Sequence, residues 1–404
     1  MRGRGRISRR EWLAASAAMA GFSLQGCVST GPGPLSGRPQ RWVGYTELRT
    51  NLPGGRYANM ITGRACVVRG DGRERRQLAE ELTREPYSWT QFAGWSPDGR
   101  YALIGRGWEA PENGAWEEAN KTFRFNDDWL YDMYLLDMET GALENVTAVD
   151  RVSRYNTGLF FIPGSPVRLG FQALIGGNSH PFRMDRDGRN KTDLSSGAEG
   201  FAYGFSASPD GRYVSYHKDY QVYVAKADGS EARKIDTGHP FNFAPQWSPD
   251  GAWLLFVSGE HEDCDPYVVR PDGSGLRRAA ARNGYKGWVA VYDVFDFHNG
   301  SSDVPVWAPD SRGIYYTALF GSTVELMWAS VDGATRQLSH SPEGVLHYHP
   351  KVSPDGKWLA FGSTRSGARQ LYVRPADPNA DAARAYPLTV LPPGSAAMWA
   401  AWQP

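Results

Sequence analysis

The stretch Trp247-Ser248-Pro249-Asp250-Gly251 decides the fold, because the chain repeats it. Ser-Pro-Asp-Gly stands again at residues 96–99, 208–211 and 353–356, and Trp-Ala-Pro-Asp-Ser at residues 307–311 is a weaker copy. In each copy proline presets φ, aspartate bonds its own backbone and glycine takes a positive φ. Each copy therefore predicts a tight turn, and the apolar, aromatic-rich run that follows it predicts a strand.

The unit around each turn contains further strands. A second apolar run is followed by an Asp-Gly hairpin signal at residues 187–188, 228–229, 272–273 or 332–333, and then by a short polar strand. Four strands recurring every ~40–60 residues are typical of the blades of a β-propeller.

We predict an all-β, seven-bladed propeller. Residues 160–171 are interpreted as a degraded copy of the unit, and six blades is the alternative if they are only an insertion. Residues 42–45 and 65–68 resemble second and third strands without a first, whereas residues 398–404 resemble a first strand without a successor. We therefore expect the two ends of residues 41–404 to share one blade, which removes exposed sheet edges.

Composition sets limits on partners and stability. The chain has 404 residues with 44 basic and 44 acidic side chains, so nothing in its charge favours nucleic acid or an anionic membrane. Only Cys66 and Cys264 fall within the predicted propeller, and two thiols do not make a disulfide framework. We expect a monomer held by its core and by ring closure.

The first residues carry targeting signals. Arg9-Arg10 and the apolar stretch after them resemble a twin-arginine export signal, and Leu24-Gln25-Gly26-Cys27 resembles the lipobox of bacterial lipoproteins. Residues 1–27 are thus interpreted as the signal, with Cys27 lipidated, and residues 28–40 as a flexible tether. This predicts a lipid-anchored, periplasm-facing protein of the outer membrane; an ordinary cleaved signal is the alternative.

Strand direction sorts the histidines onto one face. His180, His217 and His261 fall in or beside loops between second and third strands. The others fall in connections between blades, namely His239, His298, His340, His347 and His349. Both kinds of loop lie opposite the Ser-Pro-Asp-Gly turns, which predicts a histidine-rich functional face. The alternative is that the short turns simply leave no room for histidines.

The segment Leu346-His347-Tyr348-His349-Pro350 is the strongest metal-site candidate. Two histidines at i and i+2 of a strand point to one side, and paired imidazoles suit Mn, Zn or Fe. His298, or His261 in the acidic stretch 260–265, would complete the site. A hydrogen-bonded channel lining without metal, and a solvated acidic loop, are the alternatives.

Cations and aromatic residues on this face suggest an anionic ligand. The candidates for holding carboxylates or sulfates of a sugar polymer are Lys218, Lys286, Arg365 and Arg369. An insertion at residues 108–128 would place Trp108, Trp116 and Trp129 to stack on sugars or form a lid, unless they only pack the loop. No Gly-x-Ser-x-Gly motif is present, so an appended serine hydrolase is not expected.

The repeat itself resembles that of TolB-type propellers. The Trp-Ser-Pro-Asp-Gly units and the strand Gln370-Leu371-Tyr372-Val373 carry this likeness over nearly all of the chain after the tether. The resemblance implies an exported envelope protein that binds a protein partner. It implies little about activity, since a fold hosts many functions.

A narrower resemblance is to oligogalacturonate lyases, which are seven-bladed propellers with a Mn site. The segment 347–350 matches their His-Pro-His-Pro, which implies that His347 and His349 are metal ligands. His239 resembles their catalytic base, but Gly344 stands where that family has Gln, and His298 lies further from its strand. This second interpretation is a metal-dependent lyase of acidic oligosaccharides, with His239 or His298 removing a proton.

Overall fold

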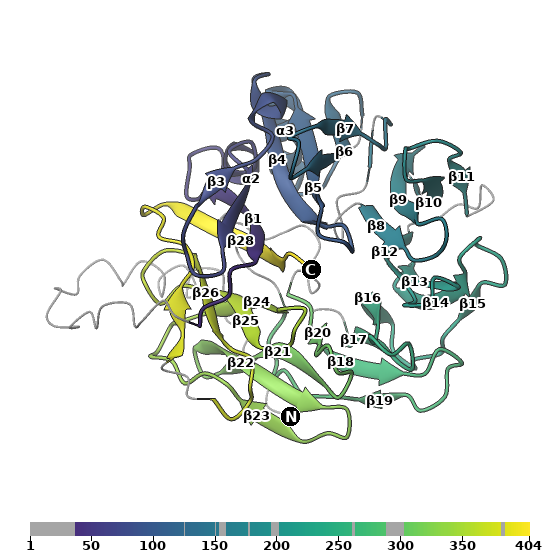
Figure 1. Cartoon of the computed structure of the whole chain (residues 1–404), viewed down its shortest axis with the longest axis vertical. Coiled ribbons are helices and arrows are strands. Elements are labelled where there is room, and N and C mark those ends of the chain that lie inside the picture. The colour runs from purple at the N-terminus through teal and green to yellow at the C-terminus, as the bar shows by residue number, and fades with distance from the viewer. Residues whose placement is uncertain are drawn as a thin grey trace, which may run out of the picture. The chain divides into compact units, whose positions relative to one another are not determined.

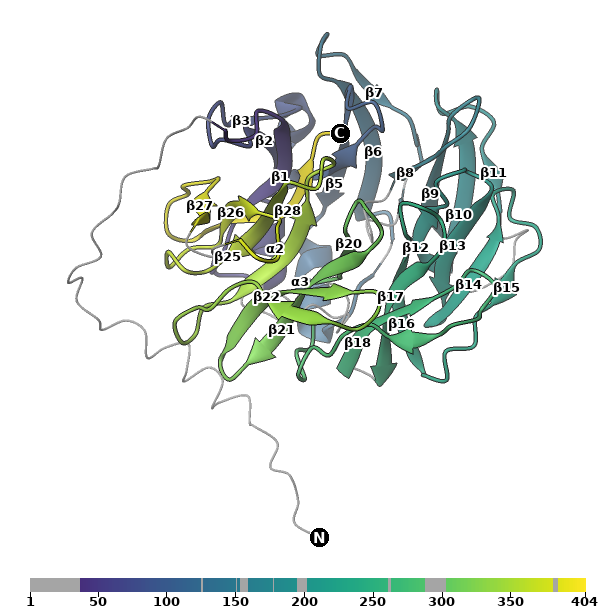
Figure 2. The same cartoon turned by 60° about the horizontal axis from the view of Figure 1, so that its bottom comes forward.

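The computed structural model describes residues 37–404 except 125, 150, 153–158, 177, 195–201, 261–262, 288–302 and 381–383. Seven antiparallel sheets of four strands each stand around a central axis (Figures 1 and 2), which confirms the seven-bladed propeller. The predicted signal, the lipidation site Cys27 and most of the tether lie outside the described residues. Within the described part of the chain, no helix is long and apolar enough to cross a membrane.

Every blade consists of four strands that follow one another from the central axis outward. The first four blades, with the innermost strand of each named first, are β28 (Ser395–Trp402), β1 (Trp42–Arg49), β2 (Arg64–Arg69) and β3 (Arg76–Gln77); β4 (Ser88–Trp95), β5 (Tyr101–Glu109), β6 (Trp129–Asp137) and β7 (Leu143–Asn145); β8 (Leu159–Ile162), β9 (Arg168–Ile175), β10 (Asn178–Asp185) and β11 (Thr192–Asp193); β12 (Ala202–Ala207), β13 (Tyr213–Lys218), β14 (Gln221–Lys226) and β15 (Arg233–Lys234). The last three are β16 (Phe241–Trp247), β17 (Leu254–Glu260), β18 (Asp263–Val269) and β19 (Arg277–Arg278); β20 (Val306–Trp307), β21 (Gly313–Phe320), β22 (Thr323–Ser330) and β23 (Thr335–Gln337); β24 (His347–Val352), β25 (Trp358–Ser363), β26 (Gln370–Pro375) and β27 (Tyr386–Pro387).

The first and last strands of the propeller share one blade and close the ring, as the sequence predicts. Strand β28 pairs antiparallel with β1, with Val43 opposite Trp402 and Arg49 opposite Ser395. The degraded copy is also a true blade, since β8 and β9 pair within a complete four-stranded sheet. Closure leaves each inner strand facing the central channel and packs each sheet against two neighbours.

The Ser-Pro-Asp-Gly turns share one hydrogen-bond pattern. In all four copies the serine hydroxyl donates to the aspartate at 2.5–2.6 Å and accepts the backbone N–H five residues further on at 2.8–3.0 Å. The four glycines have φ between 67° and 73°, as the turn requires. In the weak copy Ser311 takes φ 60°, and its hydroxyl accepts the N–H of Asp250 in the neighbouring turn at 3.0 Å.

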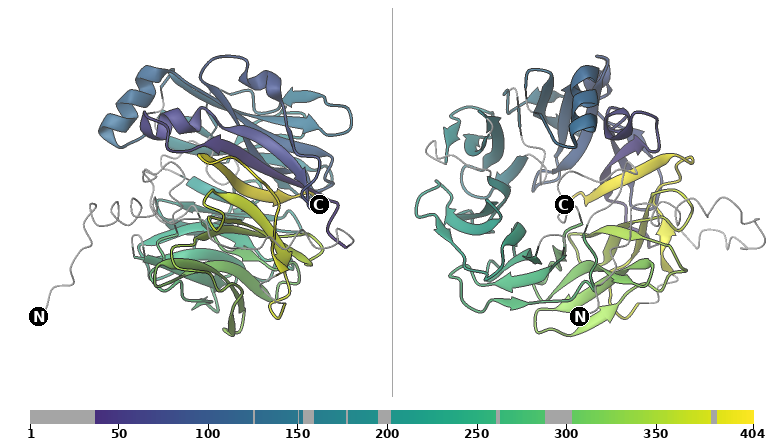
Figure 3. Two further views of the ribbon diagram at one scale, coloured as in Figure 1. Left: turned by 90° about the vertical axis from the view of Figure 1, so that its left-hand side faces the viewer. Right: turned by 180° about the vertical axis from the view of Figure 1, so that it is seen from behind.

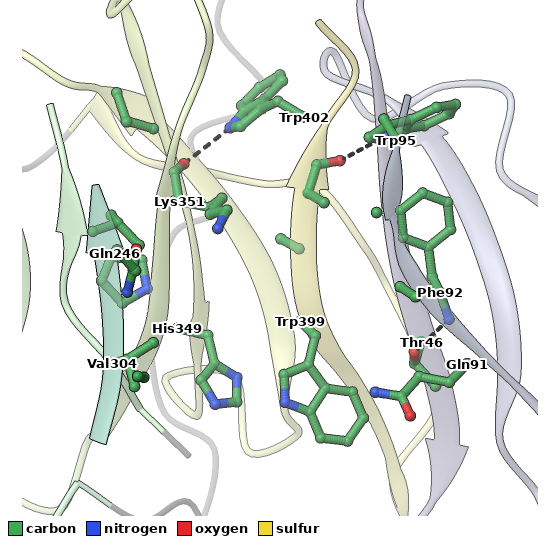
Figure 4. Close-up of a pocket in the computed structure, with 18 of the residues that line it drawn as sticks. Thr46, Gln91, Phe92, Trp95, Gln246, Val304, His349, Lys351, Trp399 and Trp402 are labelled. Atoms are coloured by element: carbon green, nitrogen blue, oxygen red, sulfur yellow. Dashed lines mark hydrogen bonds between the residues drawn. The ribbon is translucent and has the colours of Figure 1, made fainter. Parts of the chain in front are cut away.

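Tryptophans at the ends of inner strands join neighbouring blades. Trp402 donates its indole N–H to the carbonyl of Lys351 at 3.0 Å, and Trp95 donates to that of Ala401 at 2.9 Å (Figure 4). Trp247 bonds Ser206 and Trp307 bonds Gln246 in the same way, both at 3.2 Å. We call these four contacts the indole bonds.

The insertion after β5 is helical, which the sequence analysis did not predict. Helix α3 (Pro111–Asn120) packs with α2 (Gly55–Met60) on the face seen from behind in Figure 3, and a buried ion pair joins Arg56 to Glu117. A 3-10 turn, η1 (Glu80–Thr83), follows β3.

Three residues that the sequence places in loops lie in strands, and one of them is Trp108 in β5. Trp129 is a buried core residue of β6 rather than part of a sugar-stacking loop, and Cys264 lies in β18. Cys66 and Cys264 are both buried and free.

We predict that Trp402→Phe lowers the free energy of unfolding by about 1–3 kcal/mol, because the carbonyl of Lys351 loses its donor in a buried setting. Trp116→Phe is the control, since Trp116 is 36% exposed on α3 and should cost less than about 0.5 kcal/mol. Urea unfolding measures both. Equal stabilities of the two variants would contradict a role for the indole bond.

Candidate functional site

The six described histidines lie opposite the Ser-Pro-Asp-Gly turns. His217 is the next-to-last residue of β13, His180 is near the start of β10, and His347 begins β24, all at strand ends remote from those turns. His239 and His340 precede the inner strands of their next blades. The remaining candidates, His261 and His298, lie outside the described residues. We call this side of the ring the histidine face.

A cavity of about 950 Å³ occupies the centre of the ring. Two layers of side chains from the inner strands line it. The first layer, which we call the bulge layer, contains residues that each stand three positions before the end of an inner strand. Its members are Phe92, Gly204, Ala244, Val304, His349 and Trp399. The next-to-last residues form the lysine layer: Gly94, Ser206, Gln246, Val306, Lys351 and Ala401.

The bulge layer has an unusual backbone. Gly204, Ala244, His349 and Trp399 have φ of 67°, 51°, 49° and 55°, and pairing registers shift beside them. A β-bulge inserts one residue and re-aims the side chains around it. Positive φ is tolerated by glycine but is an outlier for a bulky residue such as Trp399, at a cost of order 1–3 kcal/mol.

The preceding blade supplies an acceptor for the bulge-layer amide in three blades. Phe92 N–H donates to the Thr46 hydroxyl oxygen at 3.0 Å, and Ala244 N–H donates to His217 Nδ1 at 3.3 Å. His349 N–H donates to the Asp303 carboxylate at 2.9 Å. A bulge leaves such an amide without its ladder partner, so these side chains hold the bulge in place.

Asp303 fixes the position of His349. It is 1% exposed, and its second oxygen accepts hydrogen bonds from the hydroxyls of Thr317 at 2.8 Å and Tyr285 at 3.0 Å. Burial, together with the Asp303 charge, raises the pKa of Tyr285 well above its usual range, so its hydroxyl stays a donor. The result is a satisfied buried network beneath one wall of the cavity.

His347 and His349 do not share surroundings, contrary to the expectation from their spacing. His349 lines the cavity and stacks on Trp399, with ring centroids 6.0 Å apart. His347 is 0% exposed; its Nε2 bonds the Ser341 hydroxyl at 2.8 Å and its ring meets Phe361 edge-on. The expectation was wrong because the bulge after Tyr348 interrupts the period of two.

Burial keeps two histidines neutral. It lowers the pKa of His217 to about 3, and burial with the nearby Arg365 charge lowers the pKa of His347 to about 3. Within the described residues, no three His, Cys, Asp or Glu side chains gather as metal ligands.

His239 is oriented by a hydrogen-bond chain away from the cavity. The Asn242 amide donates to the carbonyls of Tyr220 and His239 at 2.8 and 3.1 Å, so its oxygen accepts the Ser258 hydroxyl at 2.7 Å. Ser258 must then accept from His239 Nδ1 at 2.9 Å, which leaves Nε2 as the basic nitrogen. His239 does not line the cavity, so it would act as a base only on a ligand outside it.

The predicted cationic and aromatic ligand residues also lie elsewhere. Arg365 stacks over Tyr372 at 4.7 Å, Lys218 ends β13, and neither lines the cavity. Arg369 bridges to Ala396, and Trp108 is a paired residue of β5. The sequence analysis missed three cavity residues instead: Lys351, Trp399 and Gln91. Counting back from the end of each inner strand would have found the first two.

Comparison with known proteins gives partial matches, and no family model matches the chain. An uncharacterised Agrobacterium fabrum protein is 26% identical over 169 residues, which are 41% of this chain and 52% of that protein. An uncharacterised peptidase of Bacillus subtilis is 31% identical over 39% of this chain and 21% of its own. The Tol-Pal system protein TolB of Bordetella pertussis is 27% identical over 38% of this chain and 31% of its own. The matches thus span about half or less of these relatives.

Solved structures include both families that the sequence motifs resemble. An oligogalacturonate lyase in complex with manganese has a TM-score of 0.51 at 15% identity, over 83% of each chain. TolB of Acinetobacter baumannii has a TM-score of 0.45 at 17% identity, over 76% of this chain and 67% of that one. At such identities the likeness to the lyase shows the propeller fold alone.

We predict that His217→Asn flattens the pH dependence of stability. Wild-type His217 has a pKa of about 3 when folded against 6.5 ordinarily, so the unfolded chain binds the extra proton and stability falls as pH drops below about 6.5. Between pH 6.5 and pH 4.5 this group changes the free energy of unfolding by roughly 2 kcal/mol. Asparagine keeps an acceptor for Ala244 N–H but does not titrate.

The measurement is the free energy of urea unfolding between pH 4.5 and 7.5. His340→Asn is the control, because His340 is exposed. An unchanged slope in His217→Asn, or an equal loss of slope in His340→Asn, would show that His217 is not the buried neutral acceptor described above.

Proposed function

We propose that this protein is an exported, lipid-anchored propeller of the cell envelope that binds a protein partner through its histidine face. The observation that supports this proposal is the distribution of the exposed large apolar side chains. Of the eight among the described residues, Val167 and Tyr213 lie on the turn face. The other six lie on the histidine face: Tyr87, Trp116, Ile175, Tyr220, Phe320 and Val390.

This one-sided arrangement favours a partner surface. Single exposed apolar residues are normal, but their gathering on one face is typical of interaction sites. Aromatic residues contribute strongly to interfaces, and four of the six are aromatic. The turn face, by contrast, uses its charges in local pairs such as Arg212 with Asp210.

The proposed location rests on the start of the chain. The twin arginines and the Leu24–Cys27 segment support export and lipidation at Cys27, and the partial match to a Tol-Pal system protein supports an envelope role. The partner proposed is therefore another envelope protein, with the propeller itself monomeric.

We predict that a photo-crosslinking amino acid at Tyr220 captures a discrete partner in intact cells, and that one at Tyr213 does not. Tyr220 lies in the turn that follows β13 and is 43% exposed, whereas Tyr213 begins that strand at its other end and is 38% exposed, so the two form a matched pair. Equal adducts from both positions would refute the histidine face as the partner surface.

We also predict that Cys27→Ala releases the protein from the membrane, because the lipidated side chain is lost. Membrane fractionation of cells that carry this variant measures the release. Membrane-bound Cys27→Ala protein would refute the anchor.

A metal-dependent lyase of acidic oligosaccharides is the second candidate. One observation favours it: His349 lines the cavity in a fold that resembles the manganese-bound lyase. A Mn, Zn or Fe ion would there polarise the carboxylate of a uronate. The described residues do not supply a metal shell, because His347 bonds Ser341 instead, and His261 and His298 lie outside them.

Elemental analysis of untagged protein supplied with Mn, Zn or Fe tests this candidate. The lyase predicts about one tightly held equivalent, lost in the variant with His347→Ala and His349→Ala and kept in the control His340→Ala. Less than a tenth of an equivalent in every case excludes the metal site and the lyase with it.

A further inference from the structure

Lys351 places an amine inside the cavity. It belongs to the lysine layer, and its side chain points into the cavity from the inner strand β24 (Figure 4). No described residue forms an ion pair or hydrogen bond with its ammonium, and its backbone carbonyl is the acceptor of Trp402. The side chain is accessible to solvent, yet the surrounding walls lower the pKa of Lys351.

No acid in the described part of the chain balances this charge. The lowering of the Lys351 pKa comes from burial alone, without a contribution from any neighbouring charge. The other described basic residue at the cavity wall, Arg56, forms the buried ion pair with Glu117. A cation that is surrounded by protein walls and has no counter-charge there favours the binding of an anionic ligand.

Apolar surfaces make up most of the remaining wall. Trp399 and His349 present stacked rings in the bulge layer, and Phe92, Val304 and Val306 also line the cavity. Polar groups are few. Gln91 accepts the Tyr131 hydroxyl at its oxygen, which leaves its amide N–H groups for a ligand, whereas the Gln246 amide already donates to Pro305.

We propose that the cavity binds a small organic carboxylate with a flat apolar body. The carboxylate would pair with the Lys351 ammonium, and the body would lie against the stacked rings of Trp399 and His349. A volume of about 950 Å³ is at the upper end of ordinary small-molecule sites. A single cation among apolar walls suits one charge and an apolar body, rather than a polyhydroxylated ligand that needs many hydrogen bonds.

The backbone gives independent support. The equivalent residue in the fourth blade is Gly204, so the fold forms this bulge without any side chain. Trp399 instead holds a large aromatic ring at a positive φ. Strain of this kind persists where the surroundings enforce it, and it concentrates at ligand sites.

The test is a calorimetric titration of the purified full-length protein with 2-naphthoate and with its neutral counterpart, 2-naphthalenemethanol. We expect naphthoate to bind more tightly than the alcohol. Lys351→Met should weaken naphthoate about tenfold or more and leave the alcohol unchanged, since a charged hydrogen bond is lost while the side-chain stem is kept. Lys351→Arg keeps the charge and should retain the preference.

Two further variants distinguish the contribution of the apolar wall from that of the Lys351 charge. Trp399→Asn tolerates a positive φ and should weaken both ligands alike, because the apolar surface is lost. Lys357→Met is the matched control, since Lys357 is exposed in the Ser-Pro-Asp-Gly turn of the same blade and should change neither affinity. Melting curves of each variant confirm that it is folded; substitutions at residue 351 retain the carbonyl that Trp402 bonds.

Three results would overturn the proposal. They are the absence of saturable naphthoate binding to the wild-type protein, equal affinity for naphthoate and the alcohol, and an unchanged preference in folded Lys351→Met protein. This inference does not rest on the partner-binding function. Crosslinking at Tyr220 tests the histidine face, whereas naphthoate binding tests the cavity, so either proposal can fail while the other holds.

Discussion

The bond from an indole N–H to the backbone of the preceding blade is the contact on which this propeller depends. It occurs at four blade junctions, and the closing blade takes part in two of them: Trp402 donates to Lys351, and Ala401 accepts from Trp95. Each bond nets only about 1 kcal/mol, but the carbonyl it satisfies is enclosed between sheets and would be costly to leave unpaired. The bond also fixes the lysine layer, because it engages the backbone of those residues and leaves their side chains to the cavity.

The fold was predictable because its signals are local. The serine, proline, aspartate and glycine of each turn make their own hydrogen bonds within a few residues, so four letters of sequence specify the same geometry at every copy. Ring closure was predictable because the strands expected at the two ends of the propeller sequence lacked partners in their own repeats. The helix α3 was missed because its stability comes from the buried contact of Glu117 with Arg56, which lies far away in the sequence.

The cavity was not predictable by alternation, since a bulge shifts the side chains of the inner strands by one residue. That shift separates His347 from His349 and brings His349 next to Trp399 of the adjacent blade. It also makes some histidines structural. His217 is a neutral acceptor for the Ala244 amide, and His347 bonds Ser341. A count of histidines on one face therefore overstates the chemistry available there, whereas a lysine among apolar residues was easily overlooked.

The two layers of the cavity differ in what the fold demands of them. At the bulge layer the backbone favours glycine, as Gly204 shows, so His349 and Trp399 occupy their positions against that preference. At the lysine layer small residues such as Gly94 and Ala401 also suffice, yet Lys351 places an amine there and loses some hydration in doing so. Both departures act on the same enclosed volume, one through shape and the other through charge, which is the combination that a ligand with an apolar body and one negative charge would use.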